Sequence, residues 1–188
     1  MNTVPQRRRR LVAATALLAG LSGMAAAESR PPLPVAEHLD LARYQGTWHE
    51  IARLPMFFQR HCVRGTTATY TAEADGIRVF NRCLDRSGEA ITATGHARIG
   101  PEGNPAKLKV TFFWPFRADY WVIALDDDYR WALVGEPRRH YLWLLSRSPA
   151  MDRARAEAIL DKARAAGYDL GDLIWAPQDD AAPAAAAS

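Results

Sequence analysis

The chain has 188 residues, with 24 Lys or Arg against 21 Asp or Glu and a formal net charge of +3. Four of the arginines and none of the acidic residues lie in residues 1–27, so the remaining 161 residues carry 20 basic and 21 acidic side chains. The basic excess belongs to the N-terminal segment, and the composition therefore gives nucleic-acid binding no support.

Residues 1–27 have the pattern of a secretory signal peptide. Four arginines at 7–10 precede a short apolar run, and alanines at 25–27 stand before the expected cleavage site. A membrane-spanning helix needs about 20 apolar residues, and this run is interrupted by Gly20 and Ser22. We therefore expect export and removal of residues 1–27, while the choice between the Sec and twin-arginine routes stays open.

The rest of the chain predicts one domain with two flanking segments. The proline-rich residues 28–38 indicate an extended arm, residues 39–177 the domain, and residues 178–188 a disordered low-complexity tail. Because an exported protein meets an oxidising compartment, the two cysteines, Cys62 and Cys83, are expected to form a disulfide rather than a metal or catalytic site.

Short apolar segments separated by turn signals predict an all-β domain. Eight strands are expected at nearly regular spacing: 46–54, 66–72, 77–83, 90–99, 107–114, 120–125, 131–134 and 141–145. This order is typical of an eight-stranded up-and-down antiparallel β-barrel, with a two-sheet sandwich as the alternative. Cys62 precedes the second strand and Cys83 ends the third, so a disulfide across this hairpin is geometrically reasonable.

One helix is predicted after the strands. Ser148-Pro149 indicates its start and Gly167 its end, with residues 151–166 between them. Its narrow apolar face predicts a C-terminal α-helix packed on the side of the barrel, and residues 173–175 could add a last short strand. A closed eight-stranded barrel has an interior that is just wide enough for side chains or one small ligand.

Three short motifs resemble the signatures of the lipocalin family. Residues 46–48 match its G-x-W motif, residues 127–129 its T-D-Y motif with Asp in place of Thr, and Arg147 its lone arginine after the last strand. The resemblance implies that the tryptophan lies across the closed end of the barrel and that the arginine stacks on it, a cation–π pair on the order of 1–2 kcal/mol. It assigns structural roles to Gly46, Trp48, Asp128, Tyr129 and Arg147.

Longer segments within residues 39–177, among them 46–53, 120–126 and 141–147, are similar to the branch that contains bacterial outer-membrane lipocalins and apolipoprotein D. The lipid-modified cysteine of those lipoproteins has no counterpart near residue 27. We therefore expect a soluble, exported periplasmic protein, with association to the outer membrane as a further expectation.

Strand alternation predicts which side chains face the interior. Counting by twos from Trp48 points Glu50, Ala52 and Leu54 inward, and the other strands are aligned on the family motifs. The expected ligand-binding residues are Phe58, Ala68, Tyr70, Val79, Asn81, Val110, Phe112, Arg117, Tyr120, Val122, Tyr141 and Trp143. The small interior residues favour a cavity over a filled core.

Cations near the mouth could select an anionic head group. Arg117 and the pair Arg138-Arg139 are the candidates, and ordinary solvated loop charge is the alternative for each. Phe58, with Phe57 before it, could form a lip over the entrance or simply pack within its loop.

The predicted function is binding, storage or transport of fatty acids or lysophospholipids in the bacterial envelope, without catalysis, cofactor or metal. A peripheral membrane contact and a monomer or weak homodimer are also expected. Two alternatives stay open: a lipid- or isoprenoid-modifying enzyme that uses Glu50 and Tyr70, or a haem or porphyrin carrier. The carrier would need an inward histidine, whereas alternation points His49 outward.

Overall fold

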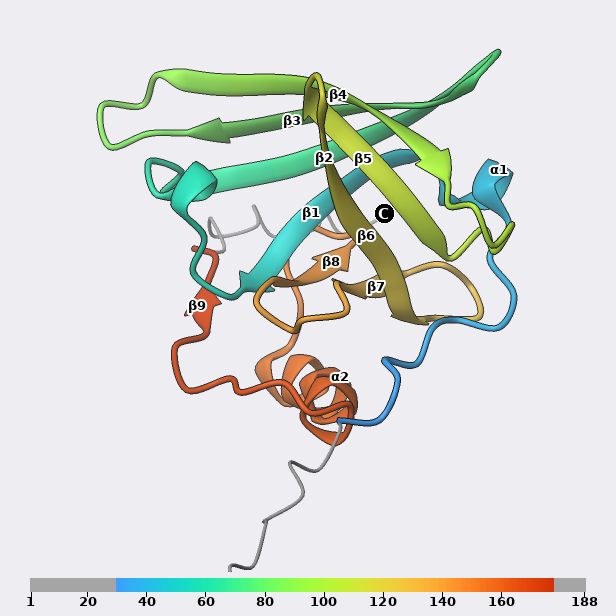
Figure 1. Cartoon of the computed structure of the whole chain (residues 1–188). Helices are drawn as coiled ribbons and strands as arrows, with labels where there is room; N and C mark the ends of the chain where they lie inside the picture. Colours follow the sequence, from blue (N-terminus) through green and yellow to red (C-terminus); the bar gives the residue numbers. More distant parts are fainter. Residues whose placement is uncertain (1–29, 178–188) are drawn as a thin grey trace, which may run out of the picture.

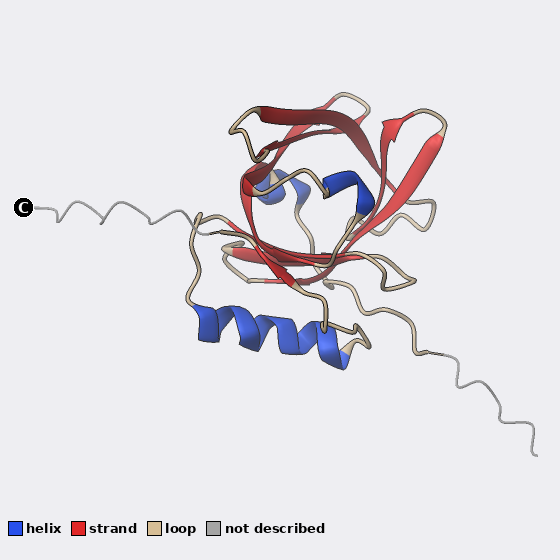
Figure 2. Ribbon diagram, turned by 90° about the vertical axis from the view of Figure 1, so that its left-hand side faces the viewer, coloured by secondary structure: helices blue, strands red, loops and turns tan. Residues whose placement is uncertain are grey.

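The eight predicted strands close into an antiparallel barrel (Figures 1 and 2). The computed structural model describes residues 30–177, so the predicted signal peptide and the predicted tail lie outside the described residues. The strands follow one another around the ring and β1 pairs with β2, which closes the sheet and excludes the sandwich. They are β1 (Gly46–Arg53), β2 (Arg64–Glu73), β3 (Gly76–Leu84), β4 (Ala90–Ile99), β5 (Lys107–Phe113), β6 (Phe116–Leu125), β7 (Trp131–Gly135) and β8 (Leu142–Ser146).

Three short elements complete the barrel. The final strand β9 (Ile174–Trp175) pairs with β1. The single-turn helix α1 (Leu41–Tyr44) is capped by the Asp40 carboxylate, which accepts a bond from the Ala42 amide, and η1 (Phe57–Gln59) is a 3₁₀ turn in the β1–β2 loop. Elements of three or four residues have no periodic pattern, which explains why α1 and η1 were not predicted.

The helix α2 (Arg153–Ala165) lies against the outside of the barrel, as Figure 2 shows. It begins after Asp152, whose carboxylate accepts a hydrogen bond from the Arg155 amide, so the predicted start at Ser148-Pro149 is wrong. Asp is among the preferred N-cap residues, and its carboxylate also interacts favourably with the helix dipole. The narrow apolar face of the helix is buried and consists of Ala156, Ile159, Leu160 and Ala163.

Strand β1 has one irregularity that changes which of its side chains face inward. A bulge between Glu50 and Ala52 interrupts its pairing with β8. Because Ile51 and Ala52 both pack in the cluster under α2, the alternation shifts by one residue. The prediction that Ala52 and Leu54 face the lumen is therefore wrong, since both belong to this outer cluster. Arg53 takes an inward position instead, paired with Trp143 of β8.

Residues 30–38 form no helix or strand, and they pack on the barrel. The Ala36 amide donates to the Val122 carbonyl of β6, and Leu33 is 6% exposed within the cluster under α2. The arm, α2 and the barrel wall therefore share one outer core, and a second core fills the lower lumen.

Candidate ligand-binding site in the barrel

The closed end of the barrel is sealed by Trp48 and Arg147. Trp48 is fully buried, and the Arg147 guanidinium carbon lies 3.9 Å from its ring centroid. The indole nitrogen donates to the Tyr44 carbonyl at 2.9 Å, and Arg147 Nη1 donates to the Thr47 carbonyl at 3.0 Å. Gly46 has φ +92°, and a Cβ there would lie 3.2 Å from Arg147 Nη1. The positive φ favours glycine at this position, and the guanidinium links the start of β1 to the end of β8.

The β6–β7 turn contributes to the same seal. Tyr129 is buried with φ 60°, and its hydroxyl accepts a hydrogen bond from the Asp40 amide at 2.8 Å. Its carbonyl accepts from Arg147 Nε at 3.4 Å. Asp128 is exposed and forms an ion pair with Arg130 at 3.4 Å, so its contacts lie outside the lumen.

Three tyrosine hydroxyls meet in the lower lumen. The Tyr120 hydroxyl lies 2.8 Å from that of Tyr44 and 2.7 Å from that of Tyr70. Burial raises the pKa of all three hydroxyls well above the ordinary value of 10.0, so the cluster stays neutral at physiological pH. It is a polar layer above the Trp48 floor.

The predicted lining residues fall into two layers. The lower layer is buried in the inner core and contains Tyr70, Val79, Val110 and Val122. The upper layer is only partly buried and contains Ala68, Asn81, Phe112, Tyr141 and Trp143. Tyr120 is also partly buried, but its hydroxyl belongs to the tyrosine cluster of the lower lumen. A ligand that enters from the open end would therefore meet the upper layer first.

The β1–β2 loop, residues 54–63, folds against the mouth of the barrel. The centroid of the Phe58 ring lies 5.5 Å from the centroid of the Tyr141 ring and 6.4 Å from that of the Trp143 ring. The Gln59 amide donates to Glu50 Oε2 at 3.0 Å and accepts from the Trp143 indole nitrogen at 2.9 Å. The loop is thus held to the lumen wall by one amide side chain and one aromatic ring.

Arg53 lies beneath this loop and was missed by sequence reasoning, because strict alternation points it outward. It is only 6% exposed, and its Nε lies 3.3 Å from Glu50 Oε1. Its Nη2 donates to the carbonyls of Gln59 at 3.4 Å and Cys62 at 3.3 Å. Among the described residues, no acceptor makes a hydrogen bond with its buried Nε or Nη1.

Glu50 is the acidic partner in this buried group. Burial raises its pKa from the ordinary value of 4.5, and the positive charge of Arg53 and the hydrogen bond from Gln59 partly oppose that rise. The folded protein therefore holds this proton more tightly than the unfolded chain does.

This shift predicts a pH-dependent stability. The contribution of Glu50 should be fully present below pH 4.5 and should be lost as the pH rises through the raised pKa. We expect the unfolding free energy of the wild type to fall over this range relative to Glu50→Gln, whose amide oxygen can still accept the bond from Gln59. Urea denaturation of both proteins at a series of pH values measures the difference, and parallel pH profiles would contradict the prediction.

The predicted head-group cations do not converge on the lumen. Arg117 is exposed at the start of β6. The next residue, Ala118, pairs with the inward-facing Val110 and therefore faces inward. Because side chains alternate along a strand, Arg117 faces the outside of the rim. Arg138 is exposed. Arg139 does not flank the mouth, because it is buried and its Nε donates to the Ala166 carbonyl at the end of α2 at 2.7 Å. Basic side chains are favoured at helix C-termini for this reason.

The predicted disulfide between Cys62 and Cys83 is present, with a Cα–Cα distance of 5.5 Å. It ties the end of the β1–β2 loop to the end of β3. The loop is therefore fixed covalently at one point and non-covalently at Gln59.

A haem site would need a histidine in the lumen, and a metal site would need a cluster of ligand side chains. His49 stands between the inward residues Trp48 and Glu50 in β1, so it faces outward. Within residues 30–177 no group of three or more His, Cys, Asp or Glu side chains could hold a metal ion. None of the helices in this part of the chain is long and apolar enough to cross a membrane.

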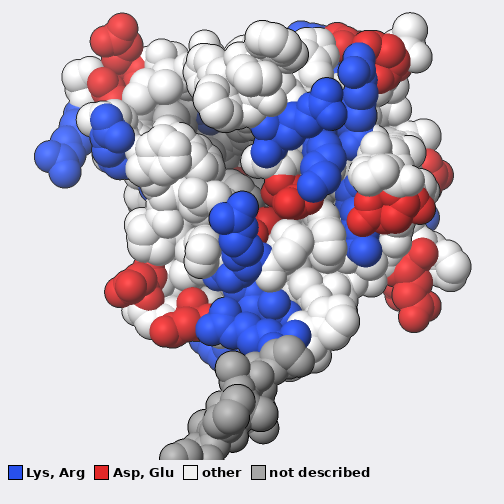
Figure 3. All heavy atoms as spheres, in the orientation of Figure 1, with Lys and Arg blue, Asp and Glu red and all other residues white. Residues whose placement is uncertain are grey.

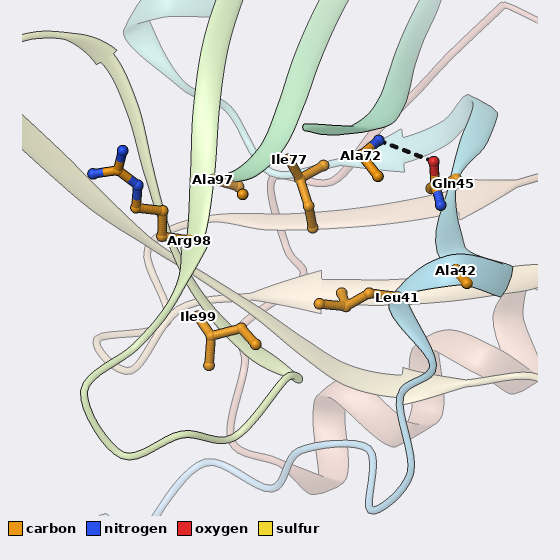
Figure 4. A pocket seen from close by; sticks show the side chains of 9 residues that line it. Leu41, Ala42, Gln45, Ala72, Ile77, Ala97, Arg98 and Ile99 are labelled. Atoms are coloured by element: carbon orange, nitrogen blue, oxygen red, sulfur yellow. Dashed lines mark hydrogen bonds between the residues drawn. The ribbon is translucent and has the colours of Figure 1, made fainter. Parts of the chain in front are cut away.

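A hollow of about 270 Å³, separate from the upper lumen, lies at the closed end between α1 and the neighbouring ends of β2, β3 and β4 (Figure 4). Leu41 of α1 and Ile77 of β3 line it, and the Gln45 side chain accepts a hydrogen bond from the Ala72 amide at its edge. Its lining is almost entirely apolar and shares no residue with the upper lumen.

Comparisons with known proteins agree with this geometry. Residues 39–178 match the family model described as a lipocalin-like domain. The outer membrane lipoprotein Blc of Citrobacter freundii is 39% identical over 177 residues, covering 92% of this chain and 99% of that protein. Apolipoprotein D of Bos taurus is 33% identical, covering 70% of this chain and 76% of its own. The structure of insecticyanin from the tobacco hornworm Manduca sexta has a TM-score of 0.63 at 23% identity, covering 80% of this chain and 86% of its own.

Proposed function

The chain belongs to the lipocalin family, whose members bind small hydrophobic ligands, and from this we propose that it binds fatty acids or lysophospholipids in its lumen. It would store or carry them in the bacterial cell envelope. The relatives named as outer membrane lipoproteins support an envelope location, and the signal-peptide pattern of residues 1–27 supports export.

The observation that carries the proposal is the upper lumen above a sealed floor. Ala68, Phe112 and Trp143 pack against the inner core, yet each is only partly buried. A wall of aromatic and small side chains above a closed end suits an acyl chain, because pockets for such ligands are mostly apolar and concave.

A lumen-filling substitution tests the proposal. Ala68→Phe places a large ring in the upper lumen, so we expect it to weaken binding of dodecanoate at least about tenfold by steric exclusion, equivalent to about 1.4 kcal/mol. Thr67→Phe is the matched control, because Thr67 directly precedes Ala68 in β2 and faces outward. Titration calorimetry on both variants and the wild type measures the affinities. Equal affinities in all three proteins would contradict the proposal.

We also propose that the open end contacts the membrane. Because β1–β2 and β5–β6 are both odd-to-even connections of an up-and-down barrel, their loops lie at the same end. Four aromatic side chains on these loops or at the strand ends next to them are strongly exposed: Phe57 at 70%, Phe113 at 78%, Trp114 at 86% and Phe116 at 77%. Figure 3 shows an uncharged surface over the tip of the β5–β6 hairpin, at the top of the view. Exposed clusters of this kind mark interaction sites, and tryptophan favours the membrane interface.

Vesicle flotation tests this contact. We expect the wild type to float with vesicles that contain phosphatidylglycerol, and the double variant Trp114→Ala, Phe116→Ala to lose most of this binding through loss of buried apolar area. Ile99→Ala is the control, because Ile99 is 46% exposed but lies at the opposite end of the barrel, at the end of β4. Unchanged flotation of the double variant would refute the contact.

A further inference from the structure

Arg53 is a buried cation at the mouth of the lumen with hydrogen-bonding capacity to spare. A guanidinium has five N–H donors. In Arg53, only Nη2 makes hydrogen bonds with residues 30–177, through contacts of 3.3 and 3.4 Å to two loop carbonyls. The Nη1 group carries two N–H donors, is itself buried, and has no hydrogen-bond acceptor among residues 30–177. An unsatisfied buried donor costs free energy, so the fold retains Arg53 here at a cost.

The acidic neighbour forms an ion pair with this cation but leaves two of its buried nitrogens without a hydrogen-bond acceptor. Glu50 Oε1 lies 3.3 Å from Arg53 Nε, but the geometry is not that of a hydrogen bond, and Nε remains without an acceptor. Glu50 Oε2 is already engaged by Gln59. Burial also raises the pKa of Glu50, which disfavours the charged form that would best neutralise the guanidinium.

Other nearby groups define where a ligand atom would lie. Arg53 is the Cα partner of Trp143, and the Trp143 ring packs against the inner core, so the guanidinium belongs to the lumen side of β1. Phe58 contacts the rings of Tyr141 and of Trp143, the residue that is paired with Arg53. An oxygen at Arg53 Nη1 would therefore have apolar rings next to it, as the first methylene groups of a lipid require.

We propose that Arg53 binds the anionic head group of the lipid, a carboxylate or a phosphate, and thereby makes the lumen selective for anionic over neutral lipids. Charge-assisted hydrogen bonds from arginine to such oxygens are shorter and about twice as strong as neutral ones, so they would replace the long contacts to the loop carbonyls. Because the loop lies against the guanidinium, residues 54–63 would move outward as the head group enters, while the Cys62–Cys83 bond holds the end of the loop. This inference rests on the proposed function, since it names the head group of the same ligand.

Two pairs of ligands, each with the same hydrocarbon chain and different head groups, measure the contribution of the head group to the affinity. Dodecanoate and dodecanol differ at a carboxylate, and dodecanoyl lysophosphatidate and dodecanoyl glycerol differ at a phosphate. We expect the wild type at about pH 8, where the carboxylate is ionised, to bind the anionic member of at least one pair more tightly. The pair with the larger ratio of anionic to neutral affinity shows whether Arg53 prefers a carboxylate or a phosphate.

Arg53→Gln should lower the affinity for the anionic member about 10- to 100-fold, because one hydrogen bond to a charged group is lost. Its affinity for the neutral member should stay within about twofold of the wild type. Arg60→Gln is the matched control, because it removes the same charge from an exposed position of the same loop, and it should leave both affinities unchanged. Equal weakening of both members by Arg53→Gln, or no weakening, would overturn the proposal.

A measurement on the wild type covers the case in which Arg53→Gln does not fold. The Arg53 Nε–H resonance in the NMR spectrum of nitrogen-labelled protein should shift on titration with the preferred anionic ligand and not with its neutral analogue. An unshifted Arg53 resonance in a protein that binds both ligands would overturn the proposal and leave the proposed function intact. A wild type that binds none of the four ligands would overturn the proposed function itself, and this inference with it.

Discussion

Replacing Trp48 with alanine is expected to lower the free energy of unfolding by about 3–5 kcal/mol. The indole is fully buried, its nitrogen donates to the Tyr44 carbonyl, and one face stacks on the Arg147 guanidinium. Its removal leaves a cavity at the floor of the barrel and takes the aromatic partner from a partly buried cation. Urea denaturation followed by far-ultraviolet circular dichroism measures the change.

Trp114→Ala is the matched control for this prediction. The substitution is the same, but Trp114 is 86% exposed at the tip of the β5–β6 hairpin, so its loss should change the stability by no more than about 0.5 kcal/mol. If the two variants were equally stable, Trp48 and Arg147 would not be the structural seal that their geometry indicates.

Loss of the Cys62–Cys83 bond is expected to have the second-largest effect. The bond closes a loop with a sequence separation of 21 residues, for which the chain-entropy model gives about 3 kcal/mol of stabilisation. We expect reduction to lower the unfolding free energy by this order without unfolding the barrel, because both cores lie largely outside the closed loop. Urea denaturation with and without dithiothreitol measures the shift.

The chain has two cysteines, so a reductant acts on this bond alone. The double variant Cys62→Ser, Cys83→Ser should match the reduced wild type and should not respond to dithiothreitol. Complete unfolding by mild reductant in the absence of urea would show that the barrel depends on the bond, contrary to this prediction.

The strands and the floor could be predicted because their determinants are local. Turn signals separate the strands, and Gly46, Trp48 and Arg147 stand in short motifs whose order along the chain is distinctive. The predicted up-and-down order needs only that each strand pair with the next one and that the last strand pair with the first. The structure confirms both conditions.

The mouth could not be predicted, because it depends on one backbone irregularity and on contacts between distant residues. The bulge after Glu50 reverses the faces of Ala52 and Arg53, and an apolar pair such as Ile51-Ala52 gives no local warning of it. Gln59 meets Trp143 across 84 residues of sequence, a contact that alternation within strands does not address.

The cations show the same limit. Arginines near a loop can serve the surface, a helix end or the lumen, and their sequence positions do not distinguish these uses. Arg139 caps α2 and also binds the Pro31 carbonyl of the arm, whereas Arg53, which lies within a strand, faces the lumen. Burial and hydrogen-bond partners, rather than proximity to a turn, show whether an arginine serves the surface, a helix end or the lumen.

The most direct test of lipid carriage is native mass spectrometry of the protein isolated from its own cells, followed by lipid extraction. We predict adducts on the wild type that resolve into fatty acid or lysophospholipid, and their loss in Ala68→Phe but not in Thr67→Phe. A wild type that is empty as isolated and stays empty after incubation with these lipids would contradict lipid carriage. Adducts retained equally by Ala68→Phe would contradict the placement of the ligand in the lumen.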